Sequence, residues 1–107
     1  WVAQWDGSTP LGLPAGGTLR LDPPIRFDAA MTVRAREGGE RIALPARAHS
    51  HALKHVLQEL GVPPWRRAAM PLLVDDAGTV HAAGDRVVSG AFDAWLQAHD
   101  TQLAWLP

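Results

Sequence analysis

The spacing of helix-breaking residues is the feature that most restricts how this chain can fold. Nine prolines and ten glycines are spread through 107 residues, and eight of these nineteen fall within residues 1–30. Proline removes a backbone donor and glycine weakens a helix, so residues 1–30 cannot hold a helix of useful length. We expect them to be lead-in strands and turns of a single domain that residues 31–107 complete. The expected strands are residues 1–5, 11–13 and 18–21.

A strand and a glycine turn are predicted next. Residues 31–36 alternate apolar and polar side chains, which is typical of a half-buried strand and places Arg34 and Arg36 on its polar face. Gly38-Gly39 suits a tight turn because glycine adopts positive φ readily. We therefore expect a hairpin in which residues 41–44 return alongside residues 31–36.

One segment has a clear helical pattern. Residues 51–60 carry apolar side chains at the i, i+3, i+4 and i+7 spacing of an amphipathic helix. Ser50 is a typical N-cap residue, and a glycine and two prolines after residue 60 end the helix. Lys54 and Gln58 fall outside the apolar stripe, so they should face solvent or a partner.

Short elements are also expected in the C-terminal part, because turn-forming residues separate brief apolar segments there. These are strands at residues 72–74, 79–83 and 86–89, a turn at 75–78, a short helix at 91–98 and a closing strand at 101–106. The prediction is an α+β domain, mostly β, with one firm helix at residues 51–60.

Positive charge is concentrated in one third of the chain. Residues 34–67 hold seven cations and three acidic residues, a net charge of +4, whereas the remainder carries −5. Arginine supplies nine of the ten cations, which favours bidentate contacts with phosphate. The pattern indicates either a face for an anionic partner or an ordinary solvated surface.

The spacing of reactive side chains does not identify a catalytic or metal site. His49, His51 and His55 could share a helix face as metal ligands, but no nearby Asp, Glu or Cys completes the set. Asp75 and Asp76 resemble a carboxylate pair, yet adjacent residues of a turn point apart. We therefore predict no catalytic residue, no metal and no cofactor in this chain.

Trp65 allows two interpretations. An RNA base could stack on an indole flanked by Arg66 and Arg67. Alternatively, the preceding prolines direct Trp65 into the core, which is the arrangement we expect. Arg66 and Arg67 are then better placed as phosphate contacts.

Composition also suggests where the protein works. The chain has no cysteine, no apolar run of roughly 18 residues and no signal-peptide pattern. These features predict a soluble, cytoplasmic protein with no membrane partner. The chain opens on Trp1 instead of methionine, so we expect a piece of a longer protein.

Three blocks of sequence stand out by their order and spacing. They are the basic glycine-containing segment 34–41, the run from Ser50 through Pro63-Pro64-Trp65-Arg66, and Met70-Pro71-Leu72-Leu73-Val74. Residues 33–88, which contain them, resemble the C-terminal domain of the bacterial tRNA(Ile)-lysidine synthetase family. Residues 1–30 fit only as a variable lead-in, and residues 91–107 match poorly.

The resemblance implies a β-sandwich-like domain with a helix, similar to a domain of the phenylalanyl-tRNA synthetase β subunit. The parent enzyme would use ATP to attach lysine to the wobble cytidine of the isoleucine tRNA with a CAU anticodon. ATP and Mg²⁺ would bind its N-terminal domain, whose Ser-Gly-Gly-x-Asp-Ser signature is absent here. This chain would then be a tRNA-binding domain that contacts the acceptor stem.

The resemblance and the charge pattern together suggest the tRNA contacts. Cations would neutralise phosphates, an amide would bond a sugar or a base edge, and Glu40 would orient Arg41 or Lys54. The expected tRNA-binding residues are Arg34, Arg36, Arg41, Arg47, Lys54, Gln58, Arg66 and Arg67.

Two other functions are compatible with the sequence. The chain could be a protein interaction module that docks on the parent's own catalytic domain or forms a homodimer. A histidine-dependent metallo-hydrolase is the third reading. Salt-sensitive RNA binding, concentration-dependent mass and metal content would separate the three.

Overall fold

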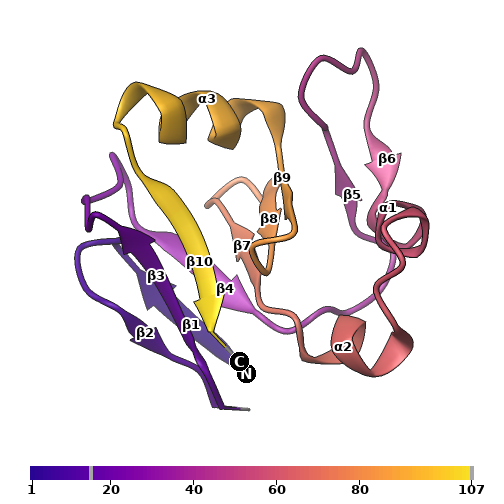
Figure 1. Cartoon of the computed structure of the whole chain (residues 1–107), viewed down its shortest axis with the longest axis horizontal. Coiled ribbons are helices and arrows are strands. Elements are labelled where there is room, and N and C mark those ends of the chain that lie inside the picture. Colours follow the sequence, from indigo (N-terminus) through magenta and orange to yellow (C-terminus); the bar gives the residue numbers. More distant parts are fainter. Residues whose placement is uncertain (15, 107) are drawn as a thin grey trace.

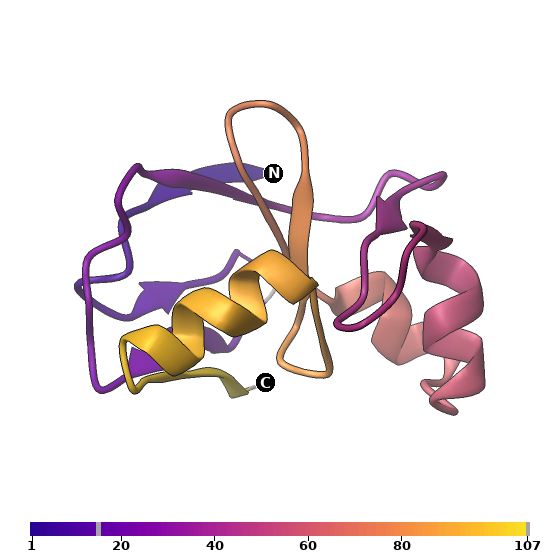
Figure 2. The ribbon, with the colours of Figure 1, turned by 90° about the horizontal axis from the view of Figure 1, so that it is seen from above.

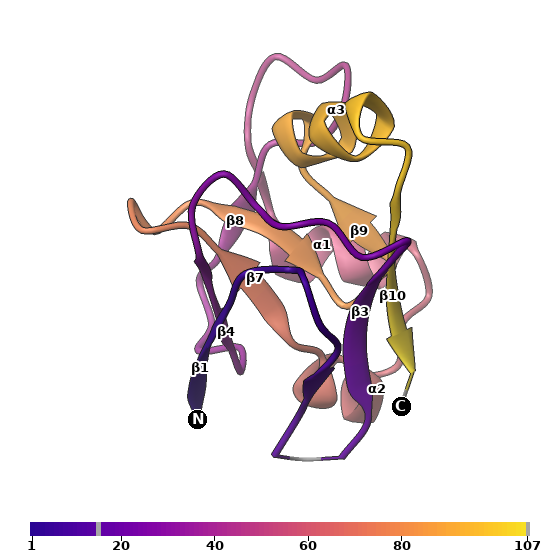
Figure 3. The ribbon, with the colours of Figure 1, turned by 90° about the vertical axis from the view of Figure 1, so that its left-hand side faces the viewer.

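Strand pairing divides the chain into two main sheets and a small ribbon, all antiparallel (Figures 1 and 3). The computed structural model describes residues 1–14 and 16–106. The larger sheet has the order β1 (Val2–Trp5), β4 (Met31–Arg34), β7 (Leu72–Val74), β8 (Val80–Ala83) and β9 (Val87–Val88). The smaller sheet has the order β10 (Gln102–Leu106), β3 (Thr18–Asp22) and β2 (Leu11–Gly12). The ribbon pairs β5 (Arg41–Ile42) with β6 (His51–Ala52).

The two main sheets share one hydrophobic core. Figure 3 shows them as separate layers with a helix across one end. Leu19 and Leu21 alternate with exposed residues along β3, and Val33 of β4 is fully buried in the same cluster. Phe27, on the connection between the sheets, packs edge-on against Trp5 with ring centroids 5.3 Å apart. This aromatic contact joins the lead-in residues to the core.

The helix across the end of the layers is α3 (Gly90–Ala98), which confirms the helix expected at residues 91–98. Ser89 caps it, because its hydroxyl accepts a hydrogen bond from the N–H of Phe92 at 3.0 Å. Phe92 and Leu96 are buried, and Trp95 is partly buried against the core. The apolar spacing of the helix therefore sets the face that it buries.

Residues 35–71 form an excursion between two neighbouring strands. Arg34 at the end of β4 pairs directly with Leu72 at the start of β7. The intervening chain makes the β5–β6 ribbon, α1 (Leu53–Glu59) and α2 (Pro64–Ala69), which stand together to one side in Figures 1 and 2. We call this excursion the basic lobe, since it contains six of the seven cations of the positive segment.

The hairpin expected across Gly38-Gly39 is wrong. Residues 31–34 pair with β1 and β7, whereas Arg41 and Ile42 pair with β6. Both glycines do have positive φ, 100° and 77°. The segment instead forms a loop around a side chain, because the Glu40 carboxylate accepts hydrogen bonds from the N–H groups of Glu37 and Gly38. A glycine pair is therefore compatible with a loop as well as a hairpin.

The helix expected at residues 51–60 is shorter, spanning Leu53–Glu59, because His51 and Ala52 belong to β6. Ser50 does not cap it: its hydroxyl accepts a hydrogen bond from Arg41 Nε at 2.9 Å. The N–H of Leu53 instead donates to the carbonyl of Glu40 at 2.9 Å. The expectation of one firm helix is also incomplete, since α2 and α3 accompany α1.

The remaining local predictions agree with the structure. The strands at 72–74 and 79–83, the turn between them, the strand at 86–89 and the closing strand at 101–106 correspond to β7, β8, β9 and β10. The fold is α+β and mostly β, as predicted. Among residues 1–14 and 16–106, no helix is long and apolar enough to cross a membrane.

We predict that Gly84→Ala destabilises the fold more than Gly78→Ala does. Both glycines have positive φ, so both changes introduce a similar backbone strain of about 1 kcal/mol. A Cβ at residue 84 would lie 2.7 Å from the Trp105 ring, whereas one at residue 78 would meet nothing within 4 Å. Overpacking should add about 1–3 kcal/mol at residue 84. Urea unfolding measures this difference, and equal losses would contradict the close packing of Trp105.

Candidate nucleic-acid interface

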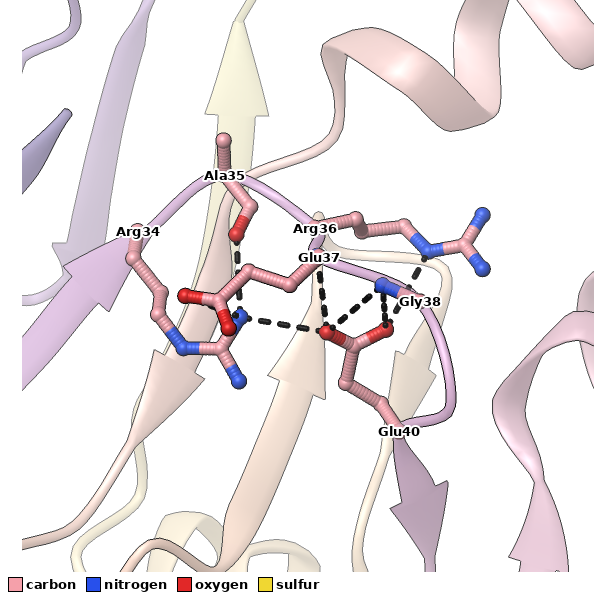
Figure 4. Close-up of polar contacts among 6 residues, drawn as sticks. All are labelled: Arg34, Ala35, Arg36, Glu37, Gly38 and Glu40. Atoms are coloured by element: carbon pink, nitrogen blue, oxygen red, sulfur yellow. Dashed lines mark hydrogen bonds and ion pairs between the residues drawn. The ribbon is translucent and has the colours of Figure 1, made fainter.

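A buried carboxylate organises the base of the basic lobe. The Glu40 side chain is only 4% exposed. Its Oε2 accepts hydrogen bonds from the N–H of Glu37 at 2.8 Å and from Arg34 Nη1 at 3.1 Å. Its Oε1 accepts from the N–H of Gly38 at 3.1 Å and lies 3.8 Å from Arg36 Nε (Figure 4). One carboxylate therefore holds two arginines and closes the loop between them.

These partners keep Glu40 ionised. Burial by itself disfavours the charged carboxylate and raises its pKa. The N–H of Glu37, the Arg34 guanidinium and the N–H of Gly38 outweigh burial and hold the pKa of Glu40 below its ordinary value. The Arg34–Glu40–Arg36 group consequently carries one net positive charge.

Arg34 and Arg36 are less exposed than most of the other expected contacts. Their side chains are 19% and 17% exposed, so most of each is packed against the loop. Arg34 also donates to the carbonyl of Ala35 at 3.0 Å. The expectation that Glu40 orients Arg41 or Lys54 is wrong, because its carboxylate is engaged by Arg34 and Arg36. Both arginines shape the loop and present only part of their surface to solvent.

Arg41 is exposed but held in place. Its Nε donates to the hydroxyl of Ser50 at 2.9 Å and its Nη2 donates to the Ser50 carbonyl at 2.8 Å. It lines a groove of about 450 Å³ together with Arg34 and the turn between β7 and β8. Two cations predicted from sequence thus meet at one groove, and Ser50, expected as a cap, fixes the orientation of one of them.

The exposed face of α1 carries two further predicted contacts. Lys54 and Gln58 are four residues apart and exposed, so they lie on one side of the helix. Arg47 is exposed on the connection between β5 and β6, beside a small hollow that His51 and His55 also line. Across the part of the chain that the structure describes, no three His, Cys, Asp or Glu side chains gather as a possible metal site.

The last predicted contacts lie on α2. Arg66 packs over the ring of Trp105 from β10, with its guanidinium carbon 5.5 Å from the ring centroid. Arg67 is partly buried on the same helix. The expectation that Trp65 enters the core is wrong, since this side chain is 77% exposed. Val62 and Met70, on either side of α2, are buried instead and anchor the helix to the core.

The sequence did not predict a further group of polar contacts, which joins Asp75, His81 and Ser89. His81 Nδ1 lies 2.9 Å from Ser89 Oγ, and His81 Nε2 lies 2.9 Å from Asp75 Oδ2. Ser89 is buried and its hydroxyl already caps α3, so the chain of contacts ties a turn to a helix. The expected turn role of Asp75 is confirmed, because its Oδ1 accepts from the N–H groups of Ala77 and Thr79.

Sequence reasoning missed two residues that matter for the surface. Glu40 was expected to act on other partners, although its position two residues after Gly38 suits acceptance of that N–H. Arg86 was counted with the acidic remainder of the chain. The structure brings it to the lobe, where its Nη2 donates to the carbonyl of Leu60 at 3.4 Å. This tertiary contact leaves no local signal in the sequence.

Comparisons with known proteins identify similar chains over the same span. The family model described as "TilS substrate C-terminal domain" matches residues 31–105. The tRNA(Ile)-lysidine synthase of Xanthomonas axonopodis pv. citri (strain 306) is 56% identical over 107 residues, covering 98% of this chain and 24% of that protein. That of Methylococcus capsulatus is 30% identical, covering 100% of this chain and 26% of that protein. The chain thus spans about a quarter of the length of these relatives.

A solved structure shows the same fold. The crystal structure of a TilS C-terminal domain matches with a TM-score of 0.64 and 19% identity, covering 84% of each chain. The match to the family model runs to residue 105, so the expectation that residues 91–107 match poorly is wrong. Alignment with the Xanthomonas protein also includes nearly all of the lead-in residues.

We predict that Glu40→Gln destabilises the chain by about 1–3 kcal/mol at pH 7, because Arg34 and Arg36 lose their buried counter-charge. The pKa of Glu40 is lowered on folding, so the unfolded chain binds more protons over this range and stability should increase as pH rises. This contribution is complete above the unfolded pKa of about 4.3 and is lost as pH falls through the lower folded value. Urea unfolding from pH 7 to about pH 3 should therefore show the two proteins converging.

Glu37→Gln is the matched control for this change. Glu37 lies in the same loop, but its side chain is 75% exposed and its carboxylate comes no nearer to Arg34 Nη1 than 3.9 Å. Its removal should cost no more than about 0.5 kcal/mol. Equal losses in the two variants would show that Glu40 does not organise the loop.

Proposed function

Because this chain belongs to the family of TilS substrate C-terminal domains, we propose that it binds the tRNA substrate of a tRNA(Ile)-lysidine synthase. The longer protein is then a ligase that uses ATP and Mg²⁺ to attach lysine to the wobble cytidine of the isoleucine tRNA with a CAU anticodon. The proposed setting is the cytoplasm. This chain supplies substrate binding, and catalysis belongs to other parts of the enzyme.

The observation that carries the proposal is the separation of charge in the fold. The positive segment of the sequence becomes one lobe that projects from the sheets (Figure 2). The remaining residues carry a net charge of −5. An RNA backbone is attracted to the positive lobe and repelled by the negatively charged remainder of the domain. This distribution of charge favours one orientation of the domain on RNA.

The contacts divide into two kinds on this proposal. Arg41, Arg47, Lys54 and Arg66 are exposed and would neutralise phosphates directly. Gln58, one turn after Lys54, would hydrogen-bond a ribose hydroxyl or a base edge. Arg34 and Arg36 act mainly by building the loop with Glu40, and Arg67 adds positive potential from α2.

The acceptor stem is the part of the tRNA that we propose these residues contact. A base-paired RNA helix presents phosphates and 2′-hydroxyls, which a protein reads by shape. The groove beside Arg34 and Arg41 and the exposed face of α1 offer donors for such a backbone. Docking on the parent's catalytic domain and homodimer formation are the competing proposals.

We predict that the chain binds an acceptor-stem hairpin of an isoleucine tRNA in a salt-sensitive manner. With four to five phosphates neutralised, affinity should fall about 10² to 10³ fold between roughly 50 and 200 mM salt. Lys54→Ala should weaken binding and reduce the salt slope by about 1. Fluorescence anisotropy with labelled RNA measures both quantities.

Arg20→Ala is the matched control, because Arg20 is an exposed cation on β3, outside the lobe. It should leave affinity and slope nearly unchanged. Equal effects of the two variants would place the RNA elsewhere on the domain. Absence of RNA binding at low salt, with a mass that rises with protein concentration, would favour the homodimer.

A further inference from the structure

Trp65 is the most exposed of the large hydrophobic side chains found to be exposed in the described residues, with 77% of its surface accessible. Exposing an indole to water forfeits the burial that normally stabilises a fold. The proposed phosphate contacts do not use Trp65, because an indole carries no positive charge. The exposed face of the ring is therefore free to stack on a flat group of a partner.

The backbone at Trp65 is fixed by its neighbours. Pro63 precedes the helix and Pro64 is its first residue, which restricts both φ angles. The N–H groups of Arg66 and Arg67 both donate to the Pro63 carbonyl at 3.0 Å. The backbone of Trp65 is therefore already ordered before its ring is covered, so binding need not order it.

Arginines adjoin Trp65 along the chain. Arg66 and Arg67 follow Trp65 on α2, and Arg66 is held over Trp105 by a cation–π contact. Arg86 reaches the same region through its hydrogen bond to the carbonyl of Leu60, four residues before Pro64. Arg86 thus reaches the segment that leads into α2 from a distant part of the chain.

This combination favours a nucleic-acid base over a protein surface. Trp65 lies in the positive segment of the chain, residues 34–67, whose net charge of +4 is complementary to a polyanion and not to an average protein surface. Single-strand binders pair aromatic platforms with cations that follow the backbone. Bases inside a duplex hide their faces by stacking on each other, so the base that reaches Trp65 must be unpaired.

We propose that Trp65 is a stacking platform for an unpaired base next to the RNA helix that the basic lobe holds. The inference rests on the proposed RNA binding and extends it to a single-stranded end. The recognised feature is the junction between the duplex and an unpaired end, which in the proposed acceptor-stem substrate is the 3′ end. Arg66 and Arg67, which follow Trp65 on α2, would contact phosphates next to the stacked base.

The test compares a blunt hairpin with the same hairpin carrying a four-nucleotide 3′ overhang. The unmodified chain should bind the overhang form about 5 to 150 fold more tightly, the range expected for one stacked base. Trp65→Ala should remove this gain and leave blunt-hairpin affinity unchanged. Trp65→Phe should retain part of the gain, because a phenyl ring still stacks.

Trp1→Ala is the matched control, since Trp1 is also an exposed tryptophan but lies outside the basic lobe. It should not change either affinity. Thermal unfolding of Trp65→Ala should match that of the unmodified chain, because the removed ring is exposed.

Each other outcome has a distinct meaning. Equal weakening of both hairpins by Trp65→Ala, or no gain from the overhang in the unmodified chain, overturns the platform and leaves the RNA-binding proposal intact. Unchanged RNA affinity together with loss of concentration-dependent mass would assign Trp65 to a protein interface. Failure of the unmodified chain to bind either hairpin rejects the proposed function itself.

Discussion

The buried Glu40 carboxylate is the constraint on which the basic lobe depends. A carboxylate withdrawn from water must be compensated by charge and hydrogen bonds. Glu40 obtains both from Arg34, Arg36 and the N–H groups of the loop. Its own carbonyl accepts the N–H of Leu53, where α1 begins. One residue therefore closes the loop through its side chain and starts the helix through its backbone, so the two parts of the surface are built together.

This arrangement also resolves an electrostatic conflict. Arginines placed close together repel each other and would oppose the compact state. Glu40 offsets one of the two charges of the innermost pair, while the cations at Arg41, Lys54 and Arg66 remain exposed on separate elements. The lobe can therefore stay positive overall without a dense positive centre. Its exposed cations are distributed around an internal anion.

Sequence patterns predicted those elements whose pairing partners are close together in the sequence. The turn at residues 75–78 and the strands beside it follow from turn residues and apolar runs that are adjacent in sequence. Pairing of β4 with β7 joins residues separated by the whole lobe, so nothing at Gly38-Gly39 distinguished a hairpin from a loop. Trp65 was misassigned for a related reason. Prolines fix a backbone direction, but burial of Val62 and Met70 decides which side of α2 faces out.

The last strand links the lobe to the body of the domain. The guanidinium of Arg66 packs over the ring of Trp105 in β10. The same ring lies so near Gly84 that a side chain at residue 84 would contact it. The backbone N–H of Trp105 also donates to the carboxylate of Asp85, in the turn between β8 and β9. Residues 101–106, which belong to the segment expected to match the family poorly, thus contact both α2 and the turn between β8 and β9. Without β10 the lobe would lose the ring on which Arg66 packs, and the family match does include this strand up to residue 105.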